Sequence, residues 1–139
     1  MSANILGISG QPAILLAEDD PDQSDMLREV LEDEGYRVET AFSGDAALHK
    51  LEQHTYALII LDIRMPGLDG SGVLKACRKM EHRKTAPIIV VSAFASGTEL
   101  QQYRAEGAAA SLAKPYAIEE LLSIIASLAS KNGAERRTP

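Results

Sequence analysis

The sequence predicts a single α/β domain built on a doubly wound, five-stranded parallel sheet. Five short apolar runs alternate with five stretches of helical spacing along 139 residues, the length of one domain. Three of the runs are nearly continuous in apolar residues, as expected for strands that helices cover on both faces. Four runs end on charged or hydroxyl residues, and parallel strands bring such ends to one edge of the sheet.

The first strand and helix are expected near the start of this pattern. Residues 13–17 (AILLA) form a short apolar run typical of a buried strand. Asp20 suits a helix N-cap, Pro21 the first helical position and Gly35 the C-terminal end. Between them, helical spacing is kept by four apolar residues, Met26, Leu27, Val30 and Leu31.

The second and third units follow the same plan. A weaker strand is expected over residues 37–40, and Ser43 can cap a helix that carries Ala47, Leu48 and Leu51. The third strand is expected over residues 57–61 and runs directly into Asp62. Asp69 can cap the next helix, whose apolar positions are Val73, Leu74 and Cys77.

The last two units complete the sheet. Residues 87–91 (PIIVV) indicate a fourth strand, and residues 98–106 a short helix with Leu100 and Tyr103 as its large apolar residues. Residues 109–113 indicate a fifth strand of mostly small side chains. The final helix has the clearest amphipathic stripe, made of Ile118, Leu121, Leu122, Ile125 and Leu128.

The predicted domain spans residues 13–130, between a flexible arm at residues 1–12 and a polar tail at residues 131–139. A net charge of −6 and a pI near 5.0 argue against non-specific binding to nucleic acid or to an anionic membrane. The single cysteine, Cys77, fits a core position in a reducing compartment. No apolar run approaches the roughly 20 residues that span a bilayer, so we expect a cytoplasmic protein.

The chemistry-bearing residues gather at the predicted strand ends. The first strand ends in Glu18 and Asp19, the third in Asp62, the fourth in Ser92 and the fifth in Lys114. Carboxylates that share one edge repel each other, and without a counter-charge at least one would take up a proton at neutral pH. A divalent cation relieves this repulsion, and a few hard oxygen ligands suit Mg²⁺.

Together, metal, carboxylate, hydroxyl and lysine indicate phosphoryl chemistry. Mg²⁺, the ammonium of Lys114 and the hydroxyl of Ser92 can each take one phosphoryl oxygen, while Asp62 acts as nucleophile and forms an acyl phosphate. Taken singly, each feature has a structural reading, because acids are favoured at helix N-termini. The three histidines are most simply surface residues outside any site: His49, His54 and His82.

Four motifs follow one another along the chain: ILLAEDD, LIILDIRMPGLDG, PIIVVSA and AKPY. In this order and at this spacing they resemble the receiver domain of two-component response regulators, of the chemotaxis-regulator-like kind, from about Ala13 to Leu128. The resemblance implies a flavodoxin-like (βα)5 sheet of strand order 2-1-3-4-5. It also implies a partner, a sensor histidine kinase or a histidine phosphotransfer protein, that donates a phosphoryl group from a phosphohistidine.

The resemblance assigns roles to the acidic corner. Asp62 would accept the phosphoryl group and help to bind Mg²⁺. Asp19 would bind the metal directly and Glu18 partly through water, and the backbone carbonyl of Arg64 would complete the protein's ligands. The hydroxyl of Ser92 would turn toward the phosphoryl group.

The fifth strand carries one match to the family and one departure from it. Lys114 would pair with a phosphoryl oxygen, and the Lys114–Pro115 bond would be cis. The family usually has Tyr or Phe three residues before this lysine, where this chain has Ser111. Without a ring to bury, we expect the face from the fourth to the fifth helix to respond weakly or by another route, with Tyr103 as a substitute.

Two bulky residues are expected to flank the acyl phosphate. Arg64 lies two residues after Asp62, and Phe94 lies two residues after Ser92. Both side chains can shield the phosphoryl group from water, so we expect slow self-dephosphorylation.

Several functional readings stay open. The leading one is a stand-alone receiver, a monomer or weak dimer, that catalyses only its own phosphorylation and dephosphorylation and signals by docking to a downstream protein, without direct contact to nucleic acid. A variant is a receiver excised from a hybrid histidine kinase or larger regulator. An aspartyl-phosphate phosphatase is less favoured, because such hydrolases want a second acid where this chain has Arg64. The acidic EDDPD is wrong for the phosphate loop of a flavodoxin-like binding module, and no P-loop motif occurs.

Overall fold

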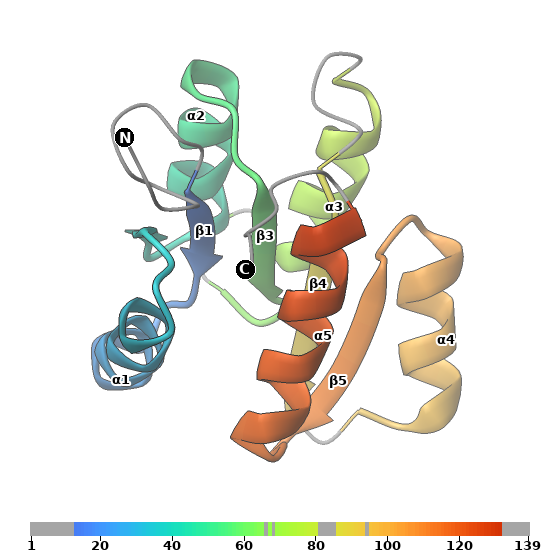
Figure 1. Cartoon of the computed structure of the whole chain (residues 1–139). Coiled ribbons are helices and arrows are strands. Elements are labelled where there is room, and N and C mark those ends of the chain that lie inside the picture. Colours follow the sequence, from blue (N-terminus) through green and yellow to red (C-terminus); the bar gives the residue numbers. More distant parts are fainter. Residues whose placement is uncertain (1–12, 66, 68, 81–85, 94, 132–139) are drawn as a thin grey trace.

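A computed structural model describes residues 13–131 apart from 66, 68, 81–85 and 94, and these form alternating strands and helices (Figure 1). The five strands make one parallel sheet of order β2-β1-β3-β4-β5, the order that the resemblance implied. In chain order the elements are β1 (Ile14–Ala17), α1 (Pro21–Asp33), β2 (Val38–Ala41), α2 (Gly44–Gln53), β3 (Leu58–Asp62), α3 (Gly70–Arg78), β4 (Ile88–Ala93), α4 (Gly97–Ala105), β5 (Ala110–Lys114) and α5 (Ile118–Lys131).

Strand register brings the carboxyl ends to one edge of the sheet. Ala17 of β1 pairs with Leu61 of β3, so the next residues, Glu18 and Asp62, lie side by side beyond the paired stretch. The arrowheads of β1, β3 and β5 all point down in Figure 1, and this lower edge carries the polar residues predicted at the strand ends.

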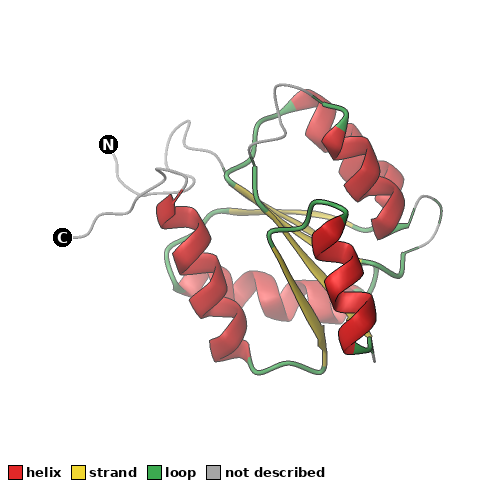
Figure 2. Ribbon diagram, turned by 90° about the vertical axis from the view of Figure 1, so that its right-hand side faces the viewer, coloured by secondary structure: helices red, strands yellow, loops and turns green. Residues whose placement is uncertain are grey.

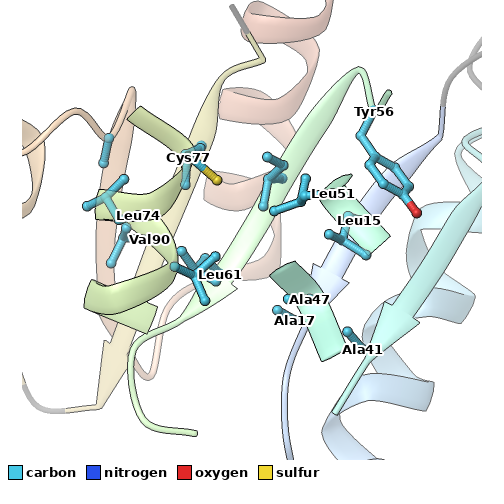
Figure 3. Close-up of a cluster of buried hydrophobic side chains, with 14 of the residues drawn as sticks. Leu15, Ala17, Ala41, Ala47, Leu51, Tyr56, Leu61, Leu74, Cys77 and Val90 are labelled. Carbon is cyan, nitrogen blue, oxygen red and sulfur yellow. The ribbon is translucent and has the colours of Figure 1, made fainter. Parts of the chain in front are cut away.

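Helices cover both faces of the sheet (Figure 2), and the side chains of the strands alternate between two cores, one on each face. On one face, α1 and α5 pack over the strands, with Leu31 and Ile125 fully buried among them. On the other face, α2 and α3 cover the strands. Figure 3 shows this second core, in which Leu51 of α2 and Leu74 of α3 meet Leu61 of β3. Burial on both faces explains why the central strands read as continuous apolar runs.

Helix boundaries follow the capping residues that the sequence marked. The side chains of Asp20, Ser43 and Asp69 each accept a hydrogen bond from a backbone N–H in the first turn of their helix. Gly35 has a φ of 97° just after α1, the left-handed conformation that glycine adopts most readily. These caps confirm the predicted starts of α1, α2 and α3.

The remaining predictions differ in their fit. Cys77 is buried, and His49 and His54 are exposed, as expected. His82, the arm at residues 1–12 and nearly all of the tail lie outside the described residues, although α5 extends one residue past the predicted boundary, to Lys131. In the part of the chain that the structure describes, every helix is too short or too polar to cross a membrane.

Candidate functional site

Three carboxylates converge at the lower edge of the sheet. Glu18, Asp19 and Asp62 each offer one oxygen, and these oxygens lie within 4.8 Å of one another. The backbone N–H of Glu18 donates to the carbonyl of Ala41 at 3.0 Å, which extends the β1–β2 pairing and fixes where the acid stands. Glu18 and Asp62 are buried, whereas Asp19 is exposed.

Lys114 enters this cluster from the end of β5. Its Nζ donates to Glu18 Oε1 at 2.8 Å and to Asp62 Oδ2 at 3.2 Å, and both pairs are largely removed from water. Its third contact is to Gln23 Oε1, at 2.9 Å. The ammonium group of Lys114 therefore joins the end of β5 to Glu18, which lies 96 residues earlier in the chain.

Burial and pairing set the protonation of this corner. Burial raises the pKa of Glu18, and the hydrogen bonds from Lys114 and from the backbone N–H of Asp20 only partly oppose this. Burial by itself would lower the pKa of Lys114, but the carboxylates of Glu18 and Asp62 outweigh it and raise that pKa above its ordinary value. Lys114 is thus held as a cation among the acids.

The turn after β3 holds the carboxylate of Asp62 in place. The backbone N–H of Arg64 donates to Asp62 Oδ1 at 3.0 Å, and that of Gly70 donates to the carbonyl of Ile63 at 3.0 Å. Gly70, the first residue of α3, packs so closely that a Cβ there would collide with the Asp62 carbonyl oxygen. Gly67 has a φ of 72° in the same turn. The glycines of this motif thus let α3 start directly against the strand end.

A cavity of about 800 Å³ opens beside the cluster. Asp19, Arg64 and Ser92 line it, together with Glu99 and Tyr103 of α4. Ser92 is buried at 5 % exposure while Arg64 is exposed, so the hydroxyl lies deep in the site and the guanidinium at its mouth. The cavity thus has a carboxylate and a hydroxyl group in its lining, and Asp19 links it to the cluster that contains Lys114.

Ser111 stands where the family usually has an aromatic residue, and it makes a hydrogen bond to α4. It is buried, and its Oγ donates to the backbone carbonyl of Leu100 in α4 at 2.9 Å. Tyr103, one turn further along α4, packs against the core under α2 and α3 and lines the cavity with Ser92. Among the described residues, the aromatic ring that lines the cavity with Ser92 therefore comes from α4 and not from β5.

Comparison with known proteins identifies the family. The family described as "Response regulator receiver domain" matches residues 14–126. This chain belongs to the response regulator receiver family. Phosphorylation and Mg²⁺ binding at an acidic pocket are typical of these receivers. The strand order and the five helices match the receiver fold of its structural neighbours.

Individual relatives agree with this assignment. The chain is 36% identical over 112 residues to "Response regulator ArlR" from Staphylococcus aureus, covering 81% of this chain and 50% of that protein, so it spans about half the length of such curated relatives. The Francisella response regulator 1452 receiver domain is 30% identical with a TM-score of 0.82, over 87% of this chain and 98% of that one. Vibrio cholerae chemotaxis protein CheY4 is 32% identical with a TM-score of 0.77, over 84% and 98%.

The receiver's acidic corner fits Mg²⁺. The ion binds oxygens at about 2.0–2.1 Å, so opposite ligands of an octahedral site lie about 4.2 Å apart. Three carboxylate oxygens within 4.8 Å of one another need only small shifts to reach this spacing. All three are hard oxygen donors, which Mg²⁺ prefers over nitrogen or sulfur.

The structure brings together five of the residues that the sequence singled out: Glu18, Asp19, Asp62, Ser92 and Lys114. The Lys114–Pro115 bond is cis, as the resemblance implied. Phe94 lies outside the described residues. Gln23 was missed, because a polar residue in the first turn of a helix gives no sequence signal of a partner 91 residues away.

Proposed function

We propose that this receiver takes a phosphoryl group from a phosphohistidine onto Asp62, in the presence of Mg²⁺. In this step a carboxylate oxygen of Asp62 forms a bond to phosphorus. The N–P bond of the phosphohistidine breaks, its electron pair stays on the imidazole nitrogen, and a proton from solvent neutralises that nitrogen. The convergence of Glu18, Asp19 and Lys114 on the buried Asp62 supports this proposal most strongly.

The proposed roles follow from these contacts. Asp19 and Asp62 would hold the metal directly, and the resemblance adds the backbone carbonyl of Arg64 as a further ligand. Both oxygens of Glu18 accept hydrogen bonds, from Lys114 and from the N–H of Asp20, so Glu18 acts on the metal partly through water. When bound, Mg²⁺ neutralises the charge that gathers on the phosphoryl oxygens.

The other two polar groups serve the phosphoryl group itself. The ammonium of Lys114 lies 3.2 Å from Asp62 Oδ2, close enough to follow a phosphoryl oxygen attached to that carboxylate. The hydroxyl of Ser92 lines the cavity together with Asp19 and would donate to another phosphoryl oxygen. The protein thereby catalyses only its own phosphorylation and dephosphorylation.

An apolar hollow beside Lys114 supports docking of the phosphodonor. It has a volume of about 550 Å³ and is lined on its apolar side by Met26, Leu27, Val30, Tyr116 and Ile118. Met26 is 64% exposed, an unusual state for a large apolar side chain that lines a hollow with the half-buried Lys114. We place the partner, a sensor histidine kinase or histidine phosphotransfer protein, on this side of the site.

We further propose that the receiver works in the cytoplasm and passes its signal by docking to a downstream protein, as a monomer or weak dimer. This holds equally for a receiver that acts alone and for one within a hybrid histidine kinase or larger regulator. A phosphatase is disfavoured because Arg64 stands where a second acid would be needed.

The departure at Ser111 shapes the proposed output. Since Ser111 is bonded to Leu100 and Tyr103 reaches the cavity, we propose that α4 itself senses the phosphoryl group. Comparing backbone chemical shifts with and without a phosphoryl mimic tests this. A large concerted shift of β5 that leaves α4 unchanged would contradict it. Shielding of the acyl phosphate by Arg64 and Phe94, and hence slow decay, stays a prediction.

The chemistry is tested by incubating the protein with acetyl phosphate and Mg²⁺ and measuring its intact mass. We expect one phosphoryl adduct on the wild type and none on Asp62→Asn. Asp33→Asn, at the exposed end of α1, is the matched control and should be labelled like the wild type. Equal labelling of Asp62→Asn would move the acceptor elsewhere and end the proposal.

A further inference from the structure

The Lys114 ammonium has three N–H donors, and each has an acceptor: Glu18, Asp62 and Gln23. We propose that Gln23 is a positioning residue for phosphoryl transfer, which holds Lys114 in place while the two acids serve the metal and the phosphoryl group. This inference rests on the proposed function, because it concerns the same lysine and the same acceptor.

The environment of Gln23 orients its amide toward the lysine. Gln23 is the third residue of α1, and its Nε2 donates to Asp20 Oδ2 at 3.1 Å. A carboxylate at neutral pH only accepts hydrogen bonds, so Asp20 must face the amide nitrogen. The amide oxygen consequently faces Lys114, at 2.9 Å.

Helix capping alone does not account for this arrangement. In a capping box, the third helical residue would accept a hydrogen bond from the backbone N–H of the N-cap residue. Here the N-cap is Asp20, and its backbone N–H donates instead to Glu18 Oε2 at 3.1 Å. The amide oxygen of Gln23 is therefore released from a capping role, and it accepts from Lys114.

The three hydrogen-bond acceptors of Lys114 differ in whether they also belong to the proposed metal site. Glu18 and Asp62 both belong to the carboxylate cluster that fits Mg²⁺. Once Asp62 is converted to the acyl phosphate, the negative charge that Lys114 faced on Asp62 Oδ2 moves to the phosphoryl oxygens, and the ammonium has to follow. Gln23 is neutral and lies outside the cluster, so its bond to Lys114 can persist through metal binding and transfer.

Gln23→Met tests this assignment, because methionine keeps the length of the side chain and removes the acceptor oxygen. We expect its rate constant for phosphorylation by saturating acetyl phosphate to fall roughly fivefold, the usual net effect of losing one hydrogen bond. The concentration of donor at half-maximal rate should stay within about twofold, since uniform binding is unchanged. Gln53→Met, at the exposed end of α2, is the matched control and should keep the wild-type rate.

Two further variants separate positioning from helix stability. Gln23→Glu keeps an oxygen for Lys114 but loses the donor to Asp20, so it should recover the rate toward the wild-type value. In a Lys114→Met background, Gln23→Met should cause no further loss, because its effect passes through the lysine. The Nζ resonance of Lys114 should shift in Gln23→Met and not in Gln53→Met. If Gln23→Met does not fold, Gln23→Ala, with its high helix propensity, serves the same purpose.

The outcomes distinguish the two proposals. A wild type that takes up no phosphoryl group overturns both of them. A labelled wild type with an unchanged rate in Gln23→Met overturns the role of Gln23 alone. If Gln23→Met lowered the rate constant by the same factor in the Lys114→Met background, that result would also overturn the role, because Gln23 would then act independently of the lysine.

Discussion

Every residue of β3 is buried, whereas none of the nine described residues of α4 is. β3 is paired on both sides, with β1 and with β4, and carries Asp62 at its end. α4 is attached through the bond from Ser111 to Leu100, through Arg78 Nη1, which lies 2.7 Å from the carbonyl of Glu106, and through the partly buried Tyr103.

This difference separates two tasks within a small domain. Under the proposed function, the carboxylate of Asp62 must be held to within a fraction of an ångström of the metal and of Lys114, which rigid central strands provide. A helix that reports on the site must be able to move, and segments with few buried apolar side chains open at low free-energy cost. Glu99 and Tyr103 line the cavity from α4, so this helix would lie within reach of the phosphoryl group that we propose for Asp62.

The largest expected effect comes from adding one methyl group at the rigid corner. Gly70→Ala places a Cβ against the carbonyl oxygen of Asp62 and the Cα of Ile63, both backbone atoms that cannot rotate away. We expect the free energy of unfolding to fall by about 2–3 kcal/mol, because overpacking forces the backbone to shift. Urea denaturation followed by circular dichroism measures it.

Gly97→Ala is the matched control at the first residue of α4. A Cβ at Gly97 would meet nothing within 4 Å, so the free energy of unfolding should change by less than about 1 kcal/mol. Equal losses in the two variants would mean that the corner is no more tightly built than α4.

A smaller effect is expected from the pH dependence of the buried acid. Burial raises the pKa of Glu18 in the folded protein above its ordinary value of 4.5. Between these two values the folded state binds more protons than the unfolded state, so the stability contributed by Glu18 is present at low pH and is lost as pH rises through the raised pKa. Without Mg²⁺, the free energy of unfolding of Glu18→Gln relative to wild type should therefore improve with rising pH from 4.5 to neutrality.

Glu29→Gln provides the comparison for this measurement. Glu29 is exposed on α1, so its replacement should leave the pH profile of the unfolding free energy parallel to that of the wild type. A Glu18→Gln profile that also runs parallel to the wild type would show that burial at this corner does not oppose ionisation.

The sequence was sufficient where a signal is local or follows from topology. The position of Asp62 at the carboxyl edge of the sheet was predicted because an apolar strand runs into it and parallel strands share one such edge. Asp20, Ser43 and Asp69 were predicted as caps because capping depends on a few neighbouring residues. These predictions needed no knowledge of side-chain geometry.

Two contacts could not be predicted, for physical reasons. The bond between Gln23 and Lys114 joins residues 91 apart, and it exists because the Asp20 backbone N–H turns to Glu18. The bond from Ser111 to Leu100 depends on which side of β5 faces α4, and that is set by the pairing of Ser111 with Val90. Strand register shifts by one residue would reverse this face, and the sequence pattern of β5 is too weak to fix it.

The smallest expected effect lies at the α4 edge. Ser111→Ala removes the hydroxyl that donates to the Leu100 carbonyl, and we expect the free energy of unfolding to fall by about 1 kcal/mol, the usual net contribution of one hydrogen bond. The loss should concentrate locally, because α4 has few other attachments. Native-state hydrogen exchange should therefore show faster exchange of amides in residues 97–105, while the amides of β3 keep their protection.

Ser127→Ala, at an exposed position on α5, is the control and should change neither the free energy of unfolding nor these exchange rates. Uniformly faster exchange across β3 and α4 in Ser111→Ala would contradict the division between a rigid corner and a lightly held helix, since it would show that α4 opens only when the whole domain unfolds.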